Sequence, residues 1–302
     1  MSAVRSSVLL AAALALASGP SALAGPPADF PTLVDVRAGH HPGVDRIVFE
    51  FEGGLPASTL VEWVDRVTQD GSGRPVTIQG DAFLLVSLHG VLGHEMTGPM
   101  ETTYGPRARA FALPNVAHVV NAGDFEAVVS FGVGLMRQTR VLRTAQRRDP
   151  ARFVVDVAAG FPTVPASVAF VEAGDVAPAM LRPSEALALT ARSVPVADRA
   201  SGALLRLWAG PTTDELAGGL RFESSRTKGF RDLRVSAGGV ARLTLAGGCR
   251  GGGKAITVAD EIMATLKPLP EIDWVKVYDR SGQTQRPSGQ SDSIPDCLTA
   301  AN

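Results

Sequence analysis

The stretch of this sequence that most resembles a chemical motif is glycine-rich and runs from Gly248 to Ala255 as GCRGGGKA. It fits the spacing G-x-x-x-x-G-K, in which backbone N–H groups and a lysine hold phosphate. A phosphate loop continues with a Ser or Thr that binds Mg²⁺, whereas Ala255 has no hydroxyl group. We therefore interpret the stretch as a flexible connection, and we predict no nucleotide and no other cofactor.

Histidines could supply a general base or metal ligands, and all five lie in the first half of the chain: His40, His41, His89, His94 and His118. A histidine that activated Cys249 would have to reach across the two halves. The motifs G-x-S-x-G and H-E-x-x-H are both missing from the sequence. Metal binding by His89 and His94, with the adjacent Glu95, is an alternative, but their spacing matches no common ligand set. The sequence therefore predicts no catalytic residue, no metal site and no enzymatic activity.

Carboxylates of the first half could form the acid/base pair of a glycan hydrolase; the candidates are Asp45, Glu50, Glu52, Glu62 and Asp65. Alternation with apolar neighbours instead predicts a solvated strand face. Aromatic side chains could stack on a sugar ring. Trp274 and Tyr278 are the candidate ligand-binding residues, whereas Trp208 lies on the apolar face of a predicted helix and is expected in the core.

The only two cysteines, Cys249 and Cys297, stand late in the chain. In an oxidising compartment such a pair usually forms a disulfide, and closing this loop would stabilise the fold by about 4 kcal/mol on the loop-entropy model. Two free thiols, or half of a metal site, are the alternatives. The second half has no histidine that could complete a mixed zinc site. We therefore predict the disulfide.

The first 24 residues have the three parts of a secretory signal peptide. Arg5 supplies the positive charge, residues 8–17 are apolar, and Ala22 and Ala24 are the small residues before a predicted cut between Ala24 and Gly25. The apolar run is about half of the roughly 20 residues that span a membrane, and no later run is longer. No cysteine near the cut could carry a lipid. We expect a secreted or extracytoplasmic envelope protein that is neither lipid-anchored nor membrane-spanning.

Composition favours a globular, turn-rich chain: 45% of the residues are hydrophobic, 20% are charged, and there are 32 glycines and 21 prolines. The formal net charge of -1 gives no basic surface for nucleic acid. Residues 30–160 read as an all-β, sandwich-like domain. Its expected strands include 47–51, 76–78, 82–88, 153–157 and a single long strand over 125–135, with a short helical turn near 114–120. Gly132 and Gly134 predict that another backbone approaches that long strand.

A proline-containing linker is expected at 161–166, followed by an α+β domain at 167–300. Apolar residues at helical spacing predict helices at 201–208 and 256–267. Strands are expected at 168–171, 186–191 and 274–278, and a hairpin at 233–235 and 240–245. A polar tail over 279–296 would be held by Cys297. The predicted fold class is therefore mixed, an N-terminal β domain plus a C-terminal α+β domain.

Two families are similar to these halves. Residues 33–157 resemble an AMIN-like domain of actinobacterial envelope proteins, through HPGVDRIVFEF at 41–51, DFE at 124–126 and RFVVDV at 152–157. Residues 168–297 resemble a GerMN domain, the module of sporulation and germination lipoproteins. That likeness is carried by ALLRLWAGPT at 203–212, GVA at 239–241, the 256–266 helix and WVKVY at 274–278.

The resemblances imply a non-catalytic binding or scaffolding protein of the cell envelope. By analogy with AMIN domains, its partner would be peptidoglycan, another cell-wall polymer or an envelope protein. A glycan hydrolase and an accessory regulatory subunit of a membrane partner are the alternatives. Neither family supplies a defined set of ligand-binding residues for this chain.

Overall fold

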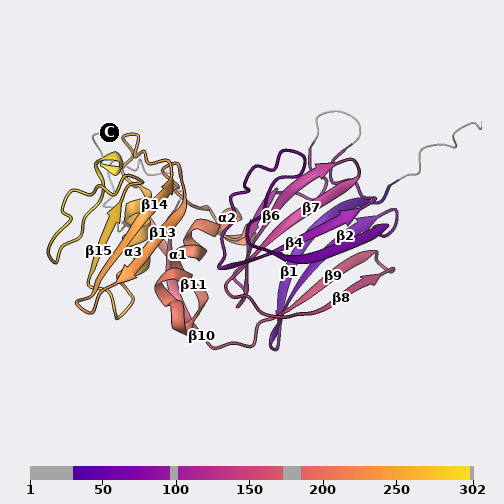
Figure 1. The fold of residues 1–302 in the computed structure, drawn as a ribbon, viewed down its shortest axis with the longest axis horizontal. Helices are drawn as coiled ribbons and strands as arrows, with labels where there is room; N and C mark the ends of the chain where they lie inside the picture. Colours follow the sequence, from indigo (N-terminus) through magenta and orange to yellow (C-terminus); the bar gives the residue numbers. More distant parts are fainter. Residues whose placement is uncertain (1–29, 96–100, 173–184, 300–302) are drawn as a thin grey trace, which may run out of the picture.

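The computed structural model describes residues 30–95, 101–172 and 185–299. The predicted signal peptide and its cut between Ala24 and Gly25 lie outside these residues. Two domains follow each other along the chain, an N-terminal β sandwich and a C-terminal domain of helices and strands (Figure 1). The predicted mixed fold class is confirmed. No helix in the described part of the chain is long and apolar enough to cross a membrane.

The N-terminal domain consists of two antiparallel sheets, with strand orders β1-β2-β9-β8 and β3-β4-β7-β6-β5. Their inner faces share one hydrophobic core, where the rings of Phe49 and Phe131 are 5.2 Å apart between centroids. Each fully buried side chain of this size contributes about 1.5–3 kcal/mol. The strands are β1 (Thr32–His41), β2 (Val44–Glu52), β3 (Ser58–Val64), β4 (Ala82–His89), β5 (Ala108–Ala110), β6 (Val116–Phe125), β7 (Val128–Leu135), β8 (Val141–Arg147) and β9 (Arg152–Ala158).

The close backbone approach predicted at Gly132 and Gly134 is confirmed. The segment between β3 and β4 crosses the outer face of the second sheet, and a Cβ on Gly134 would lie 1.9 Å from the carbonyl oxygen of Gln79. A Cβ on Gly132 would lie 2.8 Å from Val67. Only glycine leaves room for this crossing. The expected strand at 76–78 is wrong, because these residues cross the sheet instead of pairing along it.

Two further expectations for this domain are wrong. Residues 125–135 form the end of β6, a turn and β7, with Glu126 and Ala127 at φ 50° and 56°. Phe125 pairs with Val128 across this two-residue turn, so the alternation of side chains changes phase there and Phe125 faces away from Val129, although the apolar residues of the sequence continue to alternate. The expected helical turn at 114–120 is largely strand β6, whose residues pair with β7.

The C-terminal domain has two three-stranded sheets, β11-β10-β12 and β13-β14-β15. Helices α1 and α3 both pack on β10, and α3 makes the crossover between the parallel strands β14 and β15. The elements are β10 (Thr163–Glu172), β11 (Leu187–Pro195), α1 (Arg199–Ala209), α2 (Thr213–Ala217), β12 (Leu220–Arg221), β13 (Thr227–Val235), β14 (Val240–Gly247), α3 (Val258–Leu266) and β15 (Trp274–Tyr278), with one-turn helices at Val196–Asp198 and Asp296–Leu298.

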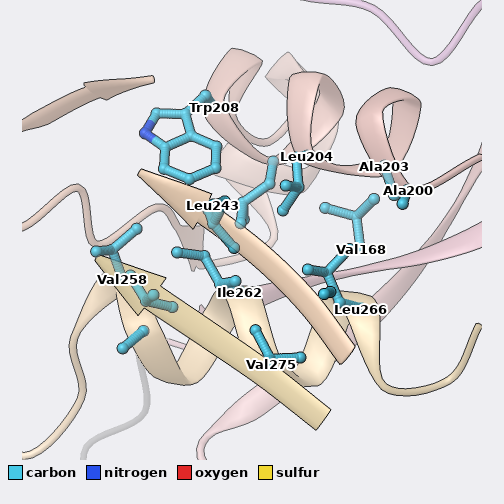
Figure 2. Packing of buried hydrophobic residues seen from close by; sticks show 14 of the residues in the cluster. Val168, Ala200, Ala203, Leu204, Trp208, Leu243, Val258, Ile262, Leu266 and Val275 are labelled. Carbon is cyan, nitrogen blue, oxygen red and sulfur yellow. The ribbon is translucent and has the colours of Figure 1, made fainter. Parts of the chain in front are cut away.

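The predicted helices, hairpin and last strand of this domain are all present. Figure 2 shows α1, α3 and the sheet strands meeting in one apolar core. Trp208 is 6% exposed there, as expected of a core residue, and its Nε1 donates to Thr227 Oγ1 at 2.9 Å. The expected linker is shorter than 161–166, because β10 already begins at Thr163 and pairs with β11.

The polar tail is held at several points. Cys249 and Cys297 form the predicted disulfide, with Cα atoms 5.7 Å apart. Lys276 of β15 is fully buried, and its Nζ donates to the carbonyl oxygens of Arg286 at 2.5 Å and Ser288 at 3.2 Å. Burial lowers the pKa of Lys276, and Arg242 and Arg286 lower it further. The tail is therefore a packed part of the domain.

One buried arginine joins the two domains. Arg206 of α1 is 1% exposed, and its Nη1 donates to the carbonyl oxygen of Phe111 in the N-terminal domain at 2.6 Å. Burial lowers its pKa to about 9; Arg192 adds to this and Asp45 opposes it. The guanidinium group also donates to the carbonyl oxygens of Leu113, Pro114, Val116 and Ser193. A second link runs from Gln79 Nε2 to the carbonyl oxygen of Lys228 at 3.0 Å. The two domains thus share buried polar contacts.

Candidate functional site

A polar cleft of about 350 Å³ opens at one end of the second sheet of the N-terminal domain. It lies where β6 ends, beside the loop that follows β3 and the segments around His94 and Arg107. Loops at the end of a rigid sheet commonly carry binding residues. The lining residues used in the argument below are Asp70, Ser72, His94, Arg107, Asp124 and Phe125.

An irregularity in β6 brings Asp70 to the cleft. The register of β6 against β7 shifts between Asn121 and Gly123, and the N–H of Asp70 donates to the carbonyl oxygen of Ala122 at 2.9 Å. A Cβ on Gly123 would lie 2.2 Å from Asp70 Oδ2. Glycine at this bulge therefore lets a carboxylate lie directly against the strand.

His94 and Asp124 form a pair inside the cleft. His94 Nδ1 lies 2.7 Å from Asp124 Oδ2, and the two side chains are 16% and 11% exposed. A Cβ on Gly93 would lie 2.9 Å from Asp124 Oδ2 and 3.1 Å from Tyr104 Cε1. The imidazole, the carboxylate and the phenol ring therefore converge at one glycine.

Several buried polar atoms here have no hydrogen-bond partner in the described part of the chain: Asp70 Oδ2, Asp124 Oδ1 and the hydroxyl of Tyr104. Buried polar groups are normally satisfied, so such atoms need an explanation. Burial raises the pKa of Tyr104 to about 12, while Arg107 lowers it and Asp124 raises it further. Tyr104 therefore interacts electrostatically with two residues that line the cleft.

The lining of the cleft is polar, with an exposed aromatic side chain at one side. Phe125 stands at its edge and is 62% exposed, which is unusual for a large aromatic side chain. Among the residues that the structure describes, no group of three or more His, Cys, Asp or Glu is placed to hold a metal ion. His94, considered above as a metal ligand, is instead hydrogen-bonded to Asp124.

Two of the five carboxylates considered for hydrolysis, Asp45 and Glu50, make contacts within the domain, whereas Glu52, Glu62 and Asp65 are exposed. Asp45 was expected on a solvated strand face, and this is wrong. It is fully buried and accepts from the backbone N–H groups of Asn115 at 2.6 Å and Val116 at 2.8 Å. It lies in phase with Ile47, on the inner face. Glu50 lies on the outer face, where hydrogen bonds from Arg37 at 2.6 Å and Arg152 at 2.9 Å lower its pKa against the opposing effect of desolvation.

The aromatic candidates Trp274 and Tyr278 lie on β15 of the other domain and are not brought to this cleft. The ammonium group of Lys267 lies 5.4 Å from the centre of the Trp274 ring. The hydroxyl of Tyr278 donates to the carbonyl oxygen of Pro287 at 3.4 Å. Their predicted ligand binding is untested and stays a prediction.

The glycine-rich stretch at 248–255 is the connection between β14 and α3. Lys254 Nζ lies 2.5 Å from Glu223 Oε2, and the N–H of Gly251 donates to the carbonyl oxygen of Cys297 at 2.6 Å. The lysine and one of the amides that a phosphate loop would use are therefore engaged in protein contacts.

Sequence reasoning did not single out Asp70, Arg107 or Asp124 as site residues. His94 and Asp124 are 30 residues apart, and Asp70 reaches the strand only through the bulge at Gly123. The available signal was Gly93 and Gly123, each next to a polar residue that lines the cleft. Such glycines often mark a close approach.

Comparison with known proteins gives a result for one part of the chain. No curated protein and no solved structure matches. No comparison supports the resemblance of the second half to a GerMN domain, which remains a prediction. The model of the AMIN-like domain matches residues 31–159, close to the 33–157 expected from the sequence. The β sandwich that carries the cleft is therefore an AMIN-like domain.

Proposed function

We propose that this protein is a non-catalytic binding or scaffolding protein of the cell envelope, and that its AMIN-like domain holds peptidoglycan or an envelope protein at the polar cleft. An AMIN-like domain suggests an extracytoplasmic, envelope-associated role. The observation that carries the proposal is the polar cleft itself, which is lined by Asp70, Arg107 and Asp124 and has the exposed Phe125 at its edge. A ligand with hydrogen-bond donors and acceptors of its own would match such a lining.

The contacts of Asp45 and Glu50, two of the five candidate carboxylates, support a binding function over a catalytic one. Asp45 is held by backbone amides, and Glu50 is held by two arginines. A hydrolase needs one carboxyl group free to give a proton and another free to act on the sugar or on water. These two residues are therefore better explained as parts of the scaffold.

The second domain is proposed to be a GerMN-like module, and the protein is proposed to be exported and cut between Ala24 and Gly25 without a lipid anchor. N-terminal sequencing of the protein recovered from its native host tests the cut. A mature chain that begins at Gly25 is the expected result. A chain that retains residues 1–24, or that carries a lipid, would contradict the proposal.

Co-sedimentation of the full chain with isolated cell wall tests the binding function. We expect retention of the protein, and at least about tenfold weaker retention of Asp124→Asn, because it loses a charged acceptor. Asp65→Asn, an exposed carboxylate of the same domain, is the matched control and should bind as the parent does. Equal loss for both variants, or no retention of the parent above an unrelated protein, would contradict wall binding.

A further inference from the structure

One strand edge of the C-terminal domain differs from the other outer strands of the sheets. β11 is the outer strand of the sheet β11-β10-β12, and among the described residues it pairs with β10 alone, without a register shift. Leu189 in this strand is 56% exposed, and residues 187–191 include no charged side chain. A regular, apolar strand edge is a template on which another strand can pair.

The hydrogen-bond pattern shows which backbone groups of β11 point away from its neighbour. In an antiparallel pair, alternate residues direct both the N–H and the C=O group to the partner strand. The N–H of Glu172 donates to the carbonyl oxygen of Ala186 at 2.9 Å, so the even-numbered residues of β11 bond to β10. Leu187 and Leu189 therefore direct their backbone groups outward, where these groups form no hydrogen bond within the described part of the chain.

The free part of this edge is short and ends at a defined residue. Arg192 Nη1 donates to the outward carbonyl oxygen of Ala191 at 3.1 Å. The next outward carbonyl oxygen, that of Ser193, accepts from Arg206 at 3.2 Å. A second strand can therefore pair with β11 at the two outward-facing leucines but not beyond them.

The other outer strands carry features that oppose such pairing. β1 and β13 have register shifts, and β5 and β12 have only three and two residues. β8 exposes Arg143 and Arg147, and β3 exposes Glu62. β15 is covered by the tail, because the N–H of Val277 donates to the carbonyl oxygen of Ser293 at 2.9 Å. Irregularity, short length, charge and coverage protect natural strand edges, and residues 187–191 have none of these features.

An apolar groove lies beside the same edge. It runs between β11 and α3, has a volume of about 570 Å³, and is lined by both leucines and by Met263. Its two charged residues are held by neighbours, Asp260 by the N–H of Thr257 and Lys267 by Asp292. The groove and the edge therefore offer apolar contact and backbone hydrogen bonds to an occupant, with no charge that a partner of different composition would have to match.

We propose that β11 pairs with β11 of a second copy of this chain, so that the protein forms a two-fold symmetric dimer. The two strands run antiparallel, with Leu187 of each copy opposite Leu189 of the other and with the two Ala188 residues opposite each other. Each leucine pair exchanges two hydrogen bonds, which satisfies the outward backbone groups of both residues. The contact is self-complementary, as two-fold symmetry requires, and it removes Leu189 from water.

Sedimentation of the purified protein from about 1 to about 300 µM tests the dimer, because so short an interface is expected to be weak. We expect a monomer–dimer equilibrium. Leu189→Lys places a charge at the edge and should weaken the dimer at least about tenfold. Leu60→Lys is the matched control, since Leu60 is 46% exposed on the outer strand β3, and it should associate as the parent does.

Three results would overturn the proposal. The first is a parent that stays monomeric over the whole range, which would leave the edge to a strand of a different protein. The second is a dimer that Leu189→Lys does not weaken. The third is a dimer that Leu189→Lys and Leu60→Lys weaken equally, provided that both variants keep the thermal midpoint of the parent.

Cysteine crosslinking tests the register. The two Ala188 residues would form a pair without mutual hydrogen bonds, with Cα atoms about 4.5 Å apart, and a disulfide spans about 4.4–6.8 Å. Ala188→Cys should therefore give a disulfide-linked dimer under mild oxidation at least about tenfold faster than Leu60→Cys, which is exposed and reacts only on random collision. Equal rates for the two variants would overturn this register and the dimer built on it.

Discussion

Each domain buries a titratable group, and burial shifts the pKa values of these two groups in opposite directions. In the AMIN-like domain, burial lowers the pKa of His118 to about 4, and its Nδ1 accepts from the N–H of Gln79 at 3.2 Å. In the C-terminal domain, burial raises the pKa of Glu261 to about 8, although the backbone N–H of Glu223 donates to it. In both cases burial favours the neutral form. One cause therefore destabilises one domain in acid and the other in base.

The largest expected effect concerns Glu261. Its pKa in the fold, about 8, is above the value of 4.5 for the unfolded chain. The contribution of Glu261 to the free energy of unfolding is therefore fully present below pH 4.5 and is lost as the pH rises through 8. Relative to Glu261→Gln, the parent should lose about 5 kcal/mol over that interval. Urea unfolding of both proteins at several pH values, followed by the fluorescence of the buried Trp208, measures the difference.

The sign of this difference is the critical point. If the difference in the free energy of unfolding between the parent and Glu261→Gln does not change with pH, Glu261 is not titrating in the fold. If this difference changes in the opposite direction, the pKa of Glu261 is lowered, because the hydrogen bond from the amide of Glu223 has a larger effect on the pKa than burial has.

Removing the disulfide sharpens the comparison, because the covalent link lies entirely within the C-terminal domain. Cys249→Ser combined with Cys297→Ser opens a loop with a sequence separation of 48. The free energy of unfolding should fall by about 4 kcal/mol. Hydrogen exchange should record faster opening of β13 to β15, with β1 to β9 little changed. Equal acceleration in both domains would show that they unfold as one unit.

His118 supplies the opposite pH effect. Its pKa in the fold, about 4, is below the value of 6.5 for the unfolded chain. The unfolded chain therefore binds the proton first, and stability falls as the pH drops from 6.5 to 4, by about 3 kcal/mol. His118→Gln should remove this part of the pH dependence. Unfolding of the two proteins followed through Trp63 checks it, and parallel curves would contradict the prediction.

The smallest expected effect on stability tests whether the two domains can unfold separately. Arg206→Met keeps most of the side-chain volume but leaves several buried carbonyl oxygens without their donor. We expect a loss of about 2 kcal/mol and a split of one thermal transition into two. Arg199→Met, on the same helix but partly exposed, is the control. A single sharp transition in Arg206→Met would show that the remaining contacts, which include the hydrogen bond from Gln79 to Lys228, are enough to couple the domains.

Local patterns in the sequence were enough for much of the fold. The spacing of apolar residues in 201–208 and 256–267 predicted both helices, and the strand at 274–278 was predicted with the bounds that the structure has. Gly132 and Gly134 indicated a backbone crossing, because a missing side chain leaves a gap that something must fill. These features depend on a few neighbouring residues.

Features that depend on distant contacts were missed. Apolar residues alternate in the sequence straight through the turn at Glu126 and Ala127, although the side chains change faces there, so the pattern could not reveal two strands. Asp45 is in phase with Ile47, so local alternation already places it on the inner face, but the amides that satisfy its carboxylate there are 70 and 71 positions away. The cleft combines a bulge in β6 with a loop more than 50 positions earlier, since Asp70 lies against Gly123. The partners in these pairings cannot be identified from neighbouring residues of the sequence.

Arg206 also has a consequence for the order of events during synthesis. Domains generally fold as units, and the N-terminal one emerges first from the ribosome. The carbonyl oxygens that Arg206 contacts belong mostly to residues 111–116, which are complete before α1 is made. The first domain therefore acts as a template on which α1 can dock, and we expect the isolated C-terminal half to fold more slowly than it does behind its neighbour.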